Sequence, residues 1–250
     1  MISPLHLLLV CLAGFVGGFI GSQVGAGSII TLPALLVAGL PLPIAVGTAS
    51  LSNWLINVAA MPKYWRAGKI HLKFVLPLSV VAAVGAYLGA RLLFVVNIAL
   101  LSKLFAVIFC VLGAAILIKP MRQERAIEAL TGWRLWLALG LAFVLGLYGG
   151  ILAVGLTTFA ILAFNLFLKQ SQLAAAANAI VLSAVLFTTS TAYFILDRKI
   201  DYSLAVPLAL TSMIGAYIGA NVALSRDRSY FKALLLLVLG LVILKLILSR

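Results

Sequence analysis

Charged residues are scarce in this sequence. They make up 9% of the 250 residues, whereas hydrophobic residues make up 65%. Soluble domains are roughly one quarter charged and half apolar, so this composition excludes an ordinary soluble fold. Uncharged runs cover residues 1–62, 74–90, 135–168, 170–196 and 202–225. Because about 20 apolar helical residues cross the hydrocarbon core of a bilayer, these runs predict a multi-pass membrane protein.

Acidic residues are rarer still, and all five fall between the apolar runs: Glu124, Glu128, Asp197, Asp201 and Asp227. Carboxylates inside a membrane mark proton relays and cation pathways, so their absence there argues against a cation carrier. The 18 Lys and Arg residues give a net charge of +13. They also lie between apolar segments, which is typical of membrane-protein loops and not of a nucleic-acid surface. Arg91 is expected to anchor its helix at the membrane surface, with a role in a cavity as the alternative.

Cysteine and histidine are almost absent. Cys11 and Cys110 lie in apolar segments, so no disulfide or metal framework is expected. His6 and His71 lie near predicted membrane edges, and the sequence contains no HExxH motif, paired carboxylates or activated nucleophile. We therefore expect neither an enzyme nor a bound cofactor. The first six residues contain no Lys or Arg, which favours an uncleaved first helix over a signal peptide.

Glycine, proline and short charged clusters divide the chain into ten predicted helical elements. Two helical repeats, 1–118 and 133–250, flank a charged linker at 119–132. The predicted elements lie near residues 5–22, 28–39, 43–62, 72–96 and 99–118, and then 133–148, 156–167, 171–196, 203–224 and 229–248.

An internal repeat supports this division. The sequence GAYLGA at residues 85–90 recurs as GAYIGA at 215–220, an offset of 130, and nearer the start of each half Phe15 and Gly18 match Phe143 and Gly146 at an offset of 128. Duplicated halves are the usual design of secondary transporters, with the site at the repeat interface. That precedent favours an inverted arrangement. Gene duplication without transport is the alternative.

A glycine-rich segment interrupts the helical pattern in each half, at residues 21–28 and 148–155. The element after each break is too short to span, so it is expected to be a half-helix that starts near the membrane midplane. Unpaired N–H groups and the positive dipole end at such a start favour an anion. Glycine allows close approach of the backbone to a ligand, although close helix packing is the alternative use of these glycines.

The third element of each half is rich in hydroxyl and amide groups, which suit a desolvated oxyanion. Hydrogen bonding between helices is the alternative role for them. The anion is expected between residues 25–28 and 154–158. The predicted substrate-binding residues are Gly25, Gly27, Ser28, Thr48, Asn53, Asn57, Gly149, Gly150, Gly155, Thr157, Thr158 and Asn178.

Several local patterns resemble the TauE/SafE sulfite exporter family, also described as toluene-sulfonate uptake permeases. They are Pro33 following the broken segment, the run Ala45-Val46-Gly47-Thr48, Tyr64, the run Gly68-Lys69-Ile70, and the later Gly-Ala-x-x-Gly-Ala. The resemblance covers nearly the whole chain. It implies a cell-membrane transporter of anions such as sulfite, sulfoacetate or other sulfonates. It also carries over a binding role to the glycines and to Thr48, although Ala26 interrupts a run that is commonly three glycines in the family.

The expected protein is thus an all-α, multi-pass inner-membrane transporter that moves a small anion, sulfite or an organosulfonate, by alternating access. Its expected partners are this substrate and the lipid bilayer, without nucleic acid, and a homodimer is left open. A passive anion channel and a membrane scaffold that transports nothing are the alternatives.

Overall fold

A computed structural model describes residues 3–93, 132–226, 229–231, 233–234, 236–237 and 240. This part of the chain is helical, with no strand among the described residues. The helices are α1 (Pro4–Val24), α2 (Gly27–Val37), α3 (Leu42–Arg66), α4 (Leu72–Leu92), α6 (Trp133–Leu152), α7 (Leu156–Leu166), α8 (Gln172–Leu196) and α9 (Tyr202–Ser225).

Eight of the ten predicted elements correspond to these helices. The element predicted at 99–118 lies outside the described residues, as do residues 119–131 of the predicted linker and most of the element at 229–248. Two helices run four residues past their predicted ends. α3 continues through Pro62 to Arg66, and α6 continues through Gly149 and Gly150 to Leu152. Membrane helices tolerate such residues where neighbouring helices support the backbone.

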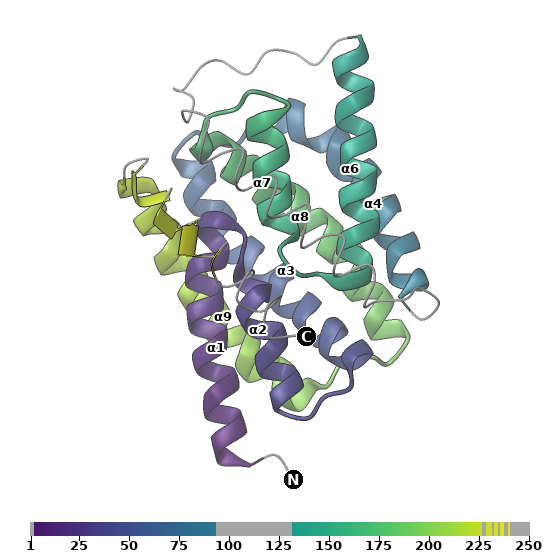
Figure 1. Ribbon diagram of the computed structural model, residues 1–250, viewed down its shortest axis with the longest axis vertical. Coiled ribbons are helices and arrows are strands. Elements are labelled where there is room, and N and C mark those ends of the chain that lie inside the picture. The colour runs from purple at the N-terminus through teal and green to yellow at the C-terminus, as the bar shows by residue number, and fades with distance from the viewer. Residues whose placement is uncertain are drawn as a thin grey trace.

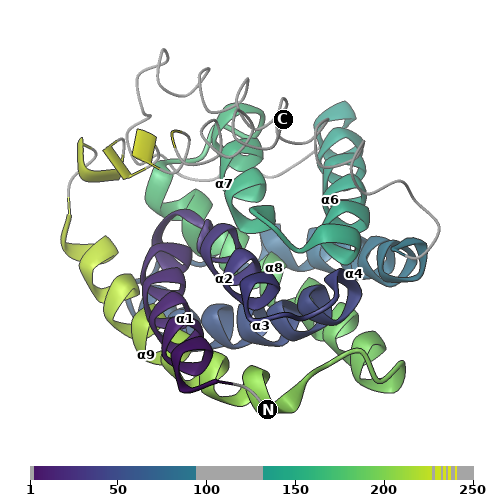
Figure 2. The same ribbon diagram turned by 60° about the horizontal axis from the view of Figure 1, so that its bottom comes forward.

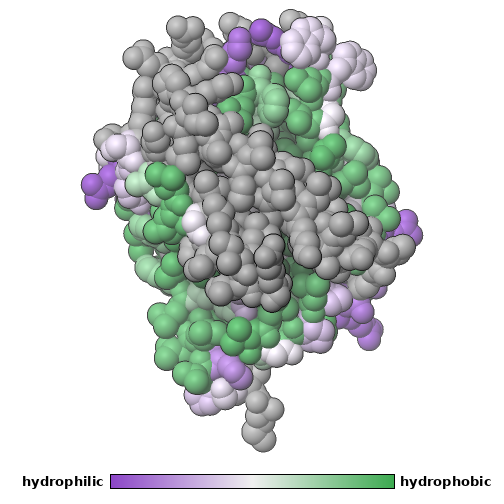
Figure 3. Space-filling view, viewed as in Figure 1, coloured by the Kyte–Doolittle hydropathy of each residue, from purple (hydrophilic) through white to green (hydrophobic). Residues whose placement is uncertain are grey.

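Six helices, α1, α3, α4, α6, α8 and α9, are long and apolar enough to cross a membrane. The 11-residue helices α2 and α7 are only about 16 Å long at 1.5 Å per residue, roughly half the hydrocarbon thickness. Figure 3 shows hydrophobic residues over most of the described surface in view, with hydrophilic residues gathered mainly towards its edges. The chain is therefore a multi-pass membrane protein.

The lipid-facing surface is built from regularly spaced apolar side chains. In α4 and α9 they recur every four residues, the spacing that places them on one face of a helix. These exposed residues are Leu76, Val80 and Val84 on α4, and Val206, Leu210 and Ile214 on α9. Their exposure is expected for a surface that faces lipid tails.

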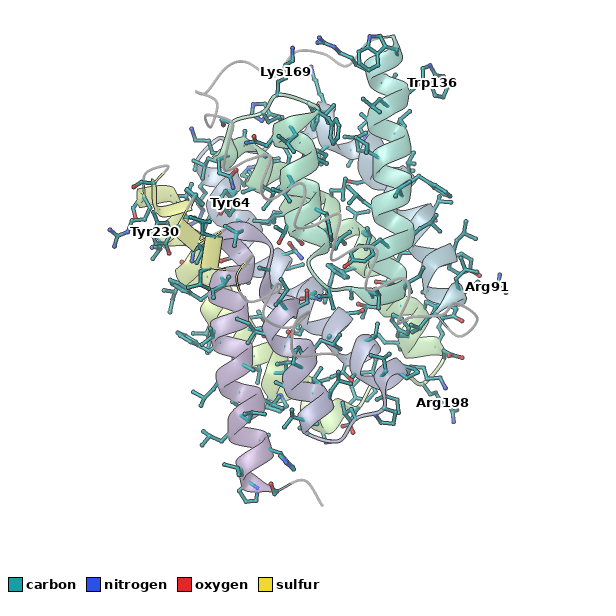
Figure 4. All side chains as sticks on the ribbon, viewed as in Figure 1. Tyr64, Arg91, Trp136, Lys169, Arg198 and Tyr230 are labelled. Atoms are coloured by element: carbon teal, nitrogen blue, oxygen red, sulfur yellow. The ribbon has the colours of Figure 1, made fainter. Side chains whose placement is uncertain are left out.

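The ends of the molecule carry the residues that suit a membrane surface. Trp136 is 74% exposed near the start of α6, and tryptophan is enriched at membrane–water interfaces. In Figure 4, Trp136 and Lys169, which lies between α7 and α8, are both at the upper end of the molecule. Arg198, between α8 and α9, lies towards the lower end.

Helices from the two parts of the sequence pack closely against each other. α1 lies beside α9, and α4 lies beside α6 (Figures 1 and 2). Glycines allow both contacts: a Cβ added to Gly18 would lie 2.1 Å from the carbonyl oxygen of Ser212, and one added to Gly146 would lie 2.3 Å from that of Ala82. Small residues let membrane helices approach in this way. α3 and α8, the most buried of the six spanning helices, contact each other between these two pairs.

Candidate functional site

The two predicted breaks are present, and each is shorter than predicted. α1 ends at Val24, and Gly25 takes the left-handed conformation with φ of 77°. α6 ends at Leu152, and Ala153 takes the same conformation with φ of 55°. The N–H of Gly25 donates to the oxygen of Gly21, and that of Ala153 donates to the oxygen of Gly149. Each long helix thus closes with the same local geometry before a half-helix begins.

The two breaks lie directly against each other, although more than 100 residues separate them in the sequence. The backbone N–H of Gly155 donates to Ser28 Oγ over 2.9 Å. Thr158 Oγ1 donates to the carbonyl oxygen of Val24 over 2.7 Å. A Cβ added to Gly25 would lie 2.3 Å from the nitrogen of Thr158. We call this contact, formed by residues 24–28 and 153–158, the junction.

Both half-helices begin at the junction, and neither start is capped by a side chain of its preceding residue, Ala26 for α2 and Gly155 for α7. By contrast, α8 and α9 are capped by Ser171 and Asp201. The first N–H groups of a helix have no partner within the helix, and they carry the positive end of its dipole. The junction therefore brings together two positive helix ends in a buried place.

Side chains of α3 and α8 complete the polar surroundings. Asn53 Nδ2 donates to the carbonyl oxygen of Ala153 over 3.3 Å, and Asn57 Nδ2 donates to the carbonyl oxygen of Asn53 over 2.7 Å. Thr157 Oγ1 donates to Ser183 Oγ over 2.9 Å. Ser183 was not among the predicted site residues, although it stands 130 residues after Asn53. The repeat offset could have identified it.

Two buried tyrosines hold the breaks in place, and the sequence reasoning did not assign them to the site. Tyr64 donates its hydroxyl to the carbonyl oxygen of Ser22 over 2.9 Å. Tyr148 donates its hydroxyl to the carbonyl oxygen of Val154. These carbonyl groups lie where helical hydrogen bonding ends, so each tyrosine satisfies a backbone group that lipid cannot hydrogen-bond.

Three of the predicted substrate-binding glycines lie so close to neighbouring groups that a side chain would not fit there. A Cβ on Gly27 would lie 2.5 Å from the oxygen of Gly17, and one on Gly150 would lie 2.2 Å from the oxygen of Ala86. A Cβ on Gly149 would lie 2.7 Å from the side chain of Leu156. Gly25 and Gly155, with φ of 77° and 66°, are the predicted glycines whose backbone conformation forms the junction.

Thr48 and Asn178 lie one step away from the junction along α3 and α8. Thr48 Oγ1 accepts from the backbone N–H of Asp201, and Asn178 Oδ1 accepts from that of His71. Each is five residues before Asn53 or Ser183, about 7.5 Å along the helix axis. In this structure they hold the starts of α9 and α4.

The residues of the junction include no Asp, Glu, Lys, Arg or His. The acids that the structure describes, Asp197 and Asp201, lie at the C-cap of α8 and the N-cap of α9, outside the spanning helices as predicted. Glu124, Glu128 and Asp227 lie outside the described residues. Arg91 is exposed in the last turn of α4, with its guanidinium carbon 5.5 Å from the centre of the Tyr87 ring. The junction thus offers helix ends, hydroxyls and amides, which suit a small anion.

Comparison with known proteins extends over almost the whole chain. The model of the family described as sulfite exporter TauE/SafE matches residues 10–246. The chain is 27% identical over 238 residues to the probable membrane transporter protein ORF9 of Sinorhizobium sp, which covers 93% of this chain and 89% of the relative. A probable membrane transporter protein of Haemophilus influenzae is 26% identical over 230 residues, with 92% and 89% covered. The probable membrane transporter protein YfcA of Escherichia coli K12 is 25% identical over 244 residues, with 95% and 88% covered. No solved structure matches the chain.

Proposed function

The chain belongs to the sulfite exporter TauE/SafE family of membrane transporters, and from this premise we propose that it carries a small oxyanion, sulfite or an organosulfonate, by alternating access. The observation that carries the proposal is the meeting of two half-helix starts at one buried junction. Such starts stabilise an anion through backbone N–H groups and helix dipoles. A fixed cation is then not required at the site.

We propose that the oxygens of the anion replace protein groups as hydrogen-bond acceptors at the junction. Ser28 Oγ accepts from the N–H of Gly155, and Thr158 Oγ1 donates to the oxygen of Val24. An oxyanion between the two breaks would accept from the N–H of Gly155 and from the hydroxyl of Thr158, and the hydroxyl of Ser28 would turn to donate to it. Hydrogen bonds to a charged group contribute roughly 1.5–3 kcal/mol each, so three such bonds would offset much of the anion's desolvation.

The alternating-access part of the proposal treats the two halves as inverted repeats. Matched glycine contacts support it: a Cβ on Gly85 would lie 2.5 Å from the oxygen of Phe143, and one on Gly215 would lie 2.1 Å from that of Phe15. α1 also begins at the lower end of the molecule (Figure 1), whereas α6 begins at the upper end near Trp136 (Figure 4). Each half would then present one half-helix start to a shared site, and movement of one half against the other would open that site to alternate sides.

Transport by proteoliposomes tests the proposal. We expect the purified protein to move sulfite or methanesulfonate, and to accumulate it uphill when a suitable ion gradient is imposed. A passive channel would equilibrate the anion without accumulating it. Ser28→Ala removes one hydroxyl donor to the bound anion, so we expect the transport kcat/KM to fall about 10- to 100-fold, roughly the 1.5–3 kcal/mol of one hydrogen bond to a charged group.

Ser79→Ala is the matched control. Ser79 is equally buried, but its hydroxyl donates to the oxygen of Val75 within its own helix and lies outside the junction. Normal sulfite and methanesulfonate flux by folded Ser28→Ala protein, equal to that of Ser79→Ala, would remove the junction from the transport path.

A further inference from the structure

A second polar cluster lies where α7 turns into α8 beside the start of α4. It contains four amide side chains that are at most 7% exposed: Asn165, Gln170, Gln172 and Asn178. Asn178 Nδ2 donates to Gln170 Oε1 over 3.0 Å, and Asn165 Nδ2 donates to Gln172 Oε1 over 3.4 Å. We call these four residues the amide cluster. It is separate from the junction, because α7 starts at the junction and ends at the amide cluster.

Backbone geometry fixes the orientation of one pair. The backbone N–H of His71 can only donate, and it points to Asn178 Oδ1 over 2.9 Å. Asn178 must therefore turn its Nδ2 to Gln170, and Gln170 must accept through Oε1. This order leaves Gln170 Nε2 buried with no acceptor among the described residues, and Gln172 Nε2 is in the same condition.

Two unpaired amide donors in one buried cluster are costly, because each loses water without gaining a partner, at about 1–3 kcal/mol. A ligand that relieves this cost must offer an acceptor to each donor. Both donors are NH₂ groups, so an oxyanion with at least two oxygens has an acceptor for each of them. A donor such as an ammonium group does not.

The electrostatic surroundings also favour an anion. α8 begins at Gln172 and α4 begins directly after His71, so two positive helix ends lie at the amide cluster, against the one negative end of α7. The turns that lead into these helices carry Lys69 and Lys169, and Lys73 is in the first turn of α4. Figure 4 places Lys169 at the upper end of the molecule. The described acids, Asp197 and Asp201, belong instead to the α8–α9 connection.

The first half of the chain does not repeat this cluster. At the offset of 130 residues, Leu40 and Leu42 stand where the second half has Gln170 and Gln172, and Thr48 stands for Asn178. The same turn between a half-helix and the next long helix is thus built without amides. The turn itself therefore does not require Gln170 and Gln172, which are present in the second half only.

We propose that the amide cluster is a second oxyanion site, at the membrane surface where α4, α7 and α8 meet, which holds the transported anion before or after the junction. The identity of the anion as sulfite or a sulfonate rests on the proposed function. A lipid phosphate has the same acceptor chemistry, and the experiment separates the two sources.

Equilibrium dialysis of radiolabelled sulfite against protein in phospholipid-free detergent tests the proposal. We expect wild-type protein to bind one ion at the junction and one at the amide cluster. The triple variant Gln170→Leu/Gln172→Leu/Asn178→Thr, which copies the first half, should lose one ion, keep the other, and raise the transport KM about 10-fold with unchanged kcat. The junction variant Ser28→Ala should weaken binding of the ion at the junction and leave the ion at the amide cluster in place.

A second variant covers the case in which the triple variant does not fold. Gln172→Glu keeps an acceptor for Asn165 and the same shape, but it replaces the unpaired donor with a negative oxygen, so it should also lose the ion. The proposal is overturned if either folded variant binds sulfite like the wild type, or if the wild type binds sulfite only at the junction and added phosphatidylglycerol occupies the amide cluster. If the triple variant loses sulfite binding and Ser28→Ala does not change it, the junction proposal is wrong and the amide-cluster proposal is supported.

Discussion

At the scale of single residues, the junction relies on hydroxyl, amide and backbone groups whose hydrogen bonds can be exchanged. Ser28 and Thr158 each bond to a backbone group of the opposite break. Such bonds cost little to exchange for bonds to an oxyanion, because each donor keeps a partner throughout. A fixed Lys or Arg would bind the anion more tightly, but it would also hold a charge in the membrane and slow release.

His71 offers a test of how protons enter transport. Its side chain is exposed, Nδ1 lies 3.2 Å from the oxygen of Lys69, and its structural bond to Asn178 uses only the backbone N–H. His71→Gln should therefore leave folding intact, and it should leave the rate and pH dependence of uphill sulfite transport within about twofold of wild type. Counterflow and pH-jump assays in proteoliposomes measure both. Loss of coupled transport by folded His71→Gln protein would mean that the imidazole, and not the substrate, carries the proton.

Sequence alone predicted several residues that the structure brings together, and it missed others for a physical reason. Ser28, Gly155 and Thr158 could be predicted because glycines in the local sequence indicate where a helix breaks. Helix packing was the alternative role for the glycines, and the sequence could not show that Gly27 and Gly150 take it, since it depends on the carbonyl oxygens of Gly17 and Ala86 on other helices. The tyrosines that close the breaks were missed because their acceptors are backbone groups.

At the scale of helices, close contacts between α4 and α6 depend on glycine. A Cβ on Gly146 would lie 2.3 Å from the oxygen of Ala82, whereas Gly140, on the same helix, has nothing within 4 Å. Gly146→Ala should push the two helices apart and lower the melting temperature in detergent by several degrees. Gly140→Ala should change it little, because its methyl group enters open space. Fluorescence-detected size-exclusion chromatography after heating measures the melting temperature of both variants. Equal melting temperatures would contradict the packing account.

The helices themselves were largely predictable from length, apolar runs and glycine. The errors came where a breaker in the sequence is tolerated in the fold. Pro62 was expected to end a helix and Gly150 to lie in a break, yet both lie inside helices. In lipid, a helix continues when a neighbour supports its backbone, and that neighbour is not visible in the local sequence.

At the scale of the whole molecule, the proposal of inverted repeats makes matched positions face opposite sides of the membrane. Lys73 and Ser203, separated by 130 residues, are both exposed in the first turns of α4 and α9. With Cys11 and Cys110 replaced by serine, Lys73→Cys and Ser203→Cys should react with an impermeant maleimide from opposite sides of intact cells. Labelling of both from the same side would show that the repeats are parallel.

The most direct test of the junction locates the anion itself. Selenite has the shape and charge of sulfite and a strong anomalous signal, so a crystal grown with selenite and measured at the selenium edge would reveal its position. We predict a peak between the starts of α2 and α7, within hydrogen-bonding distance of Ser28, the N–H of Gly155 and Thr158. Selenite peaks confined to the basic ends near Lys63 and Arg66, with none at the junction, would contradict the account.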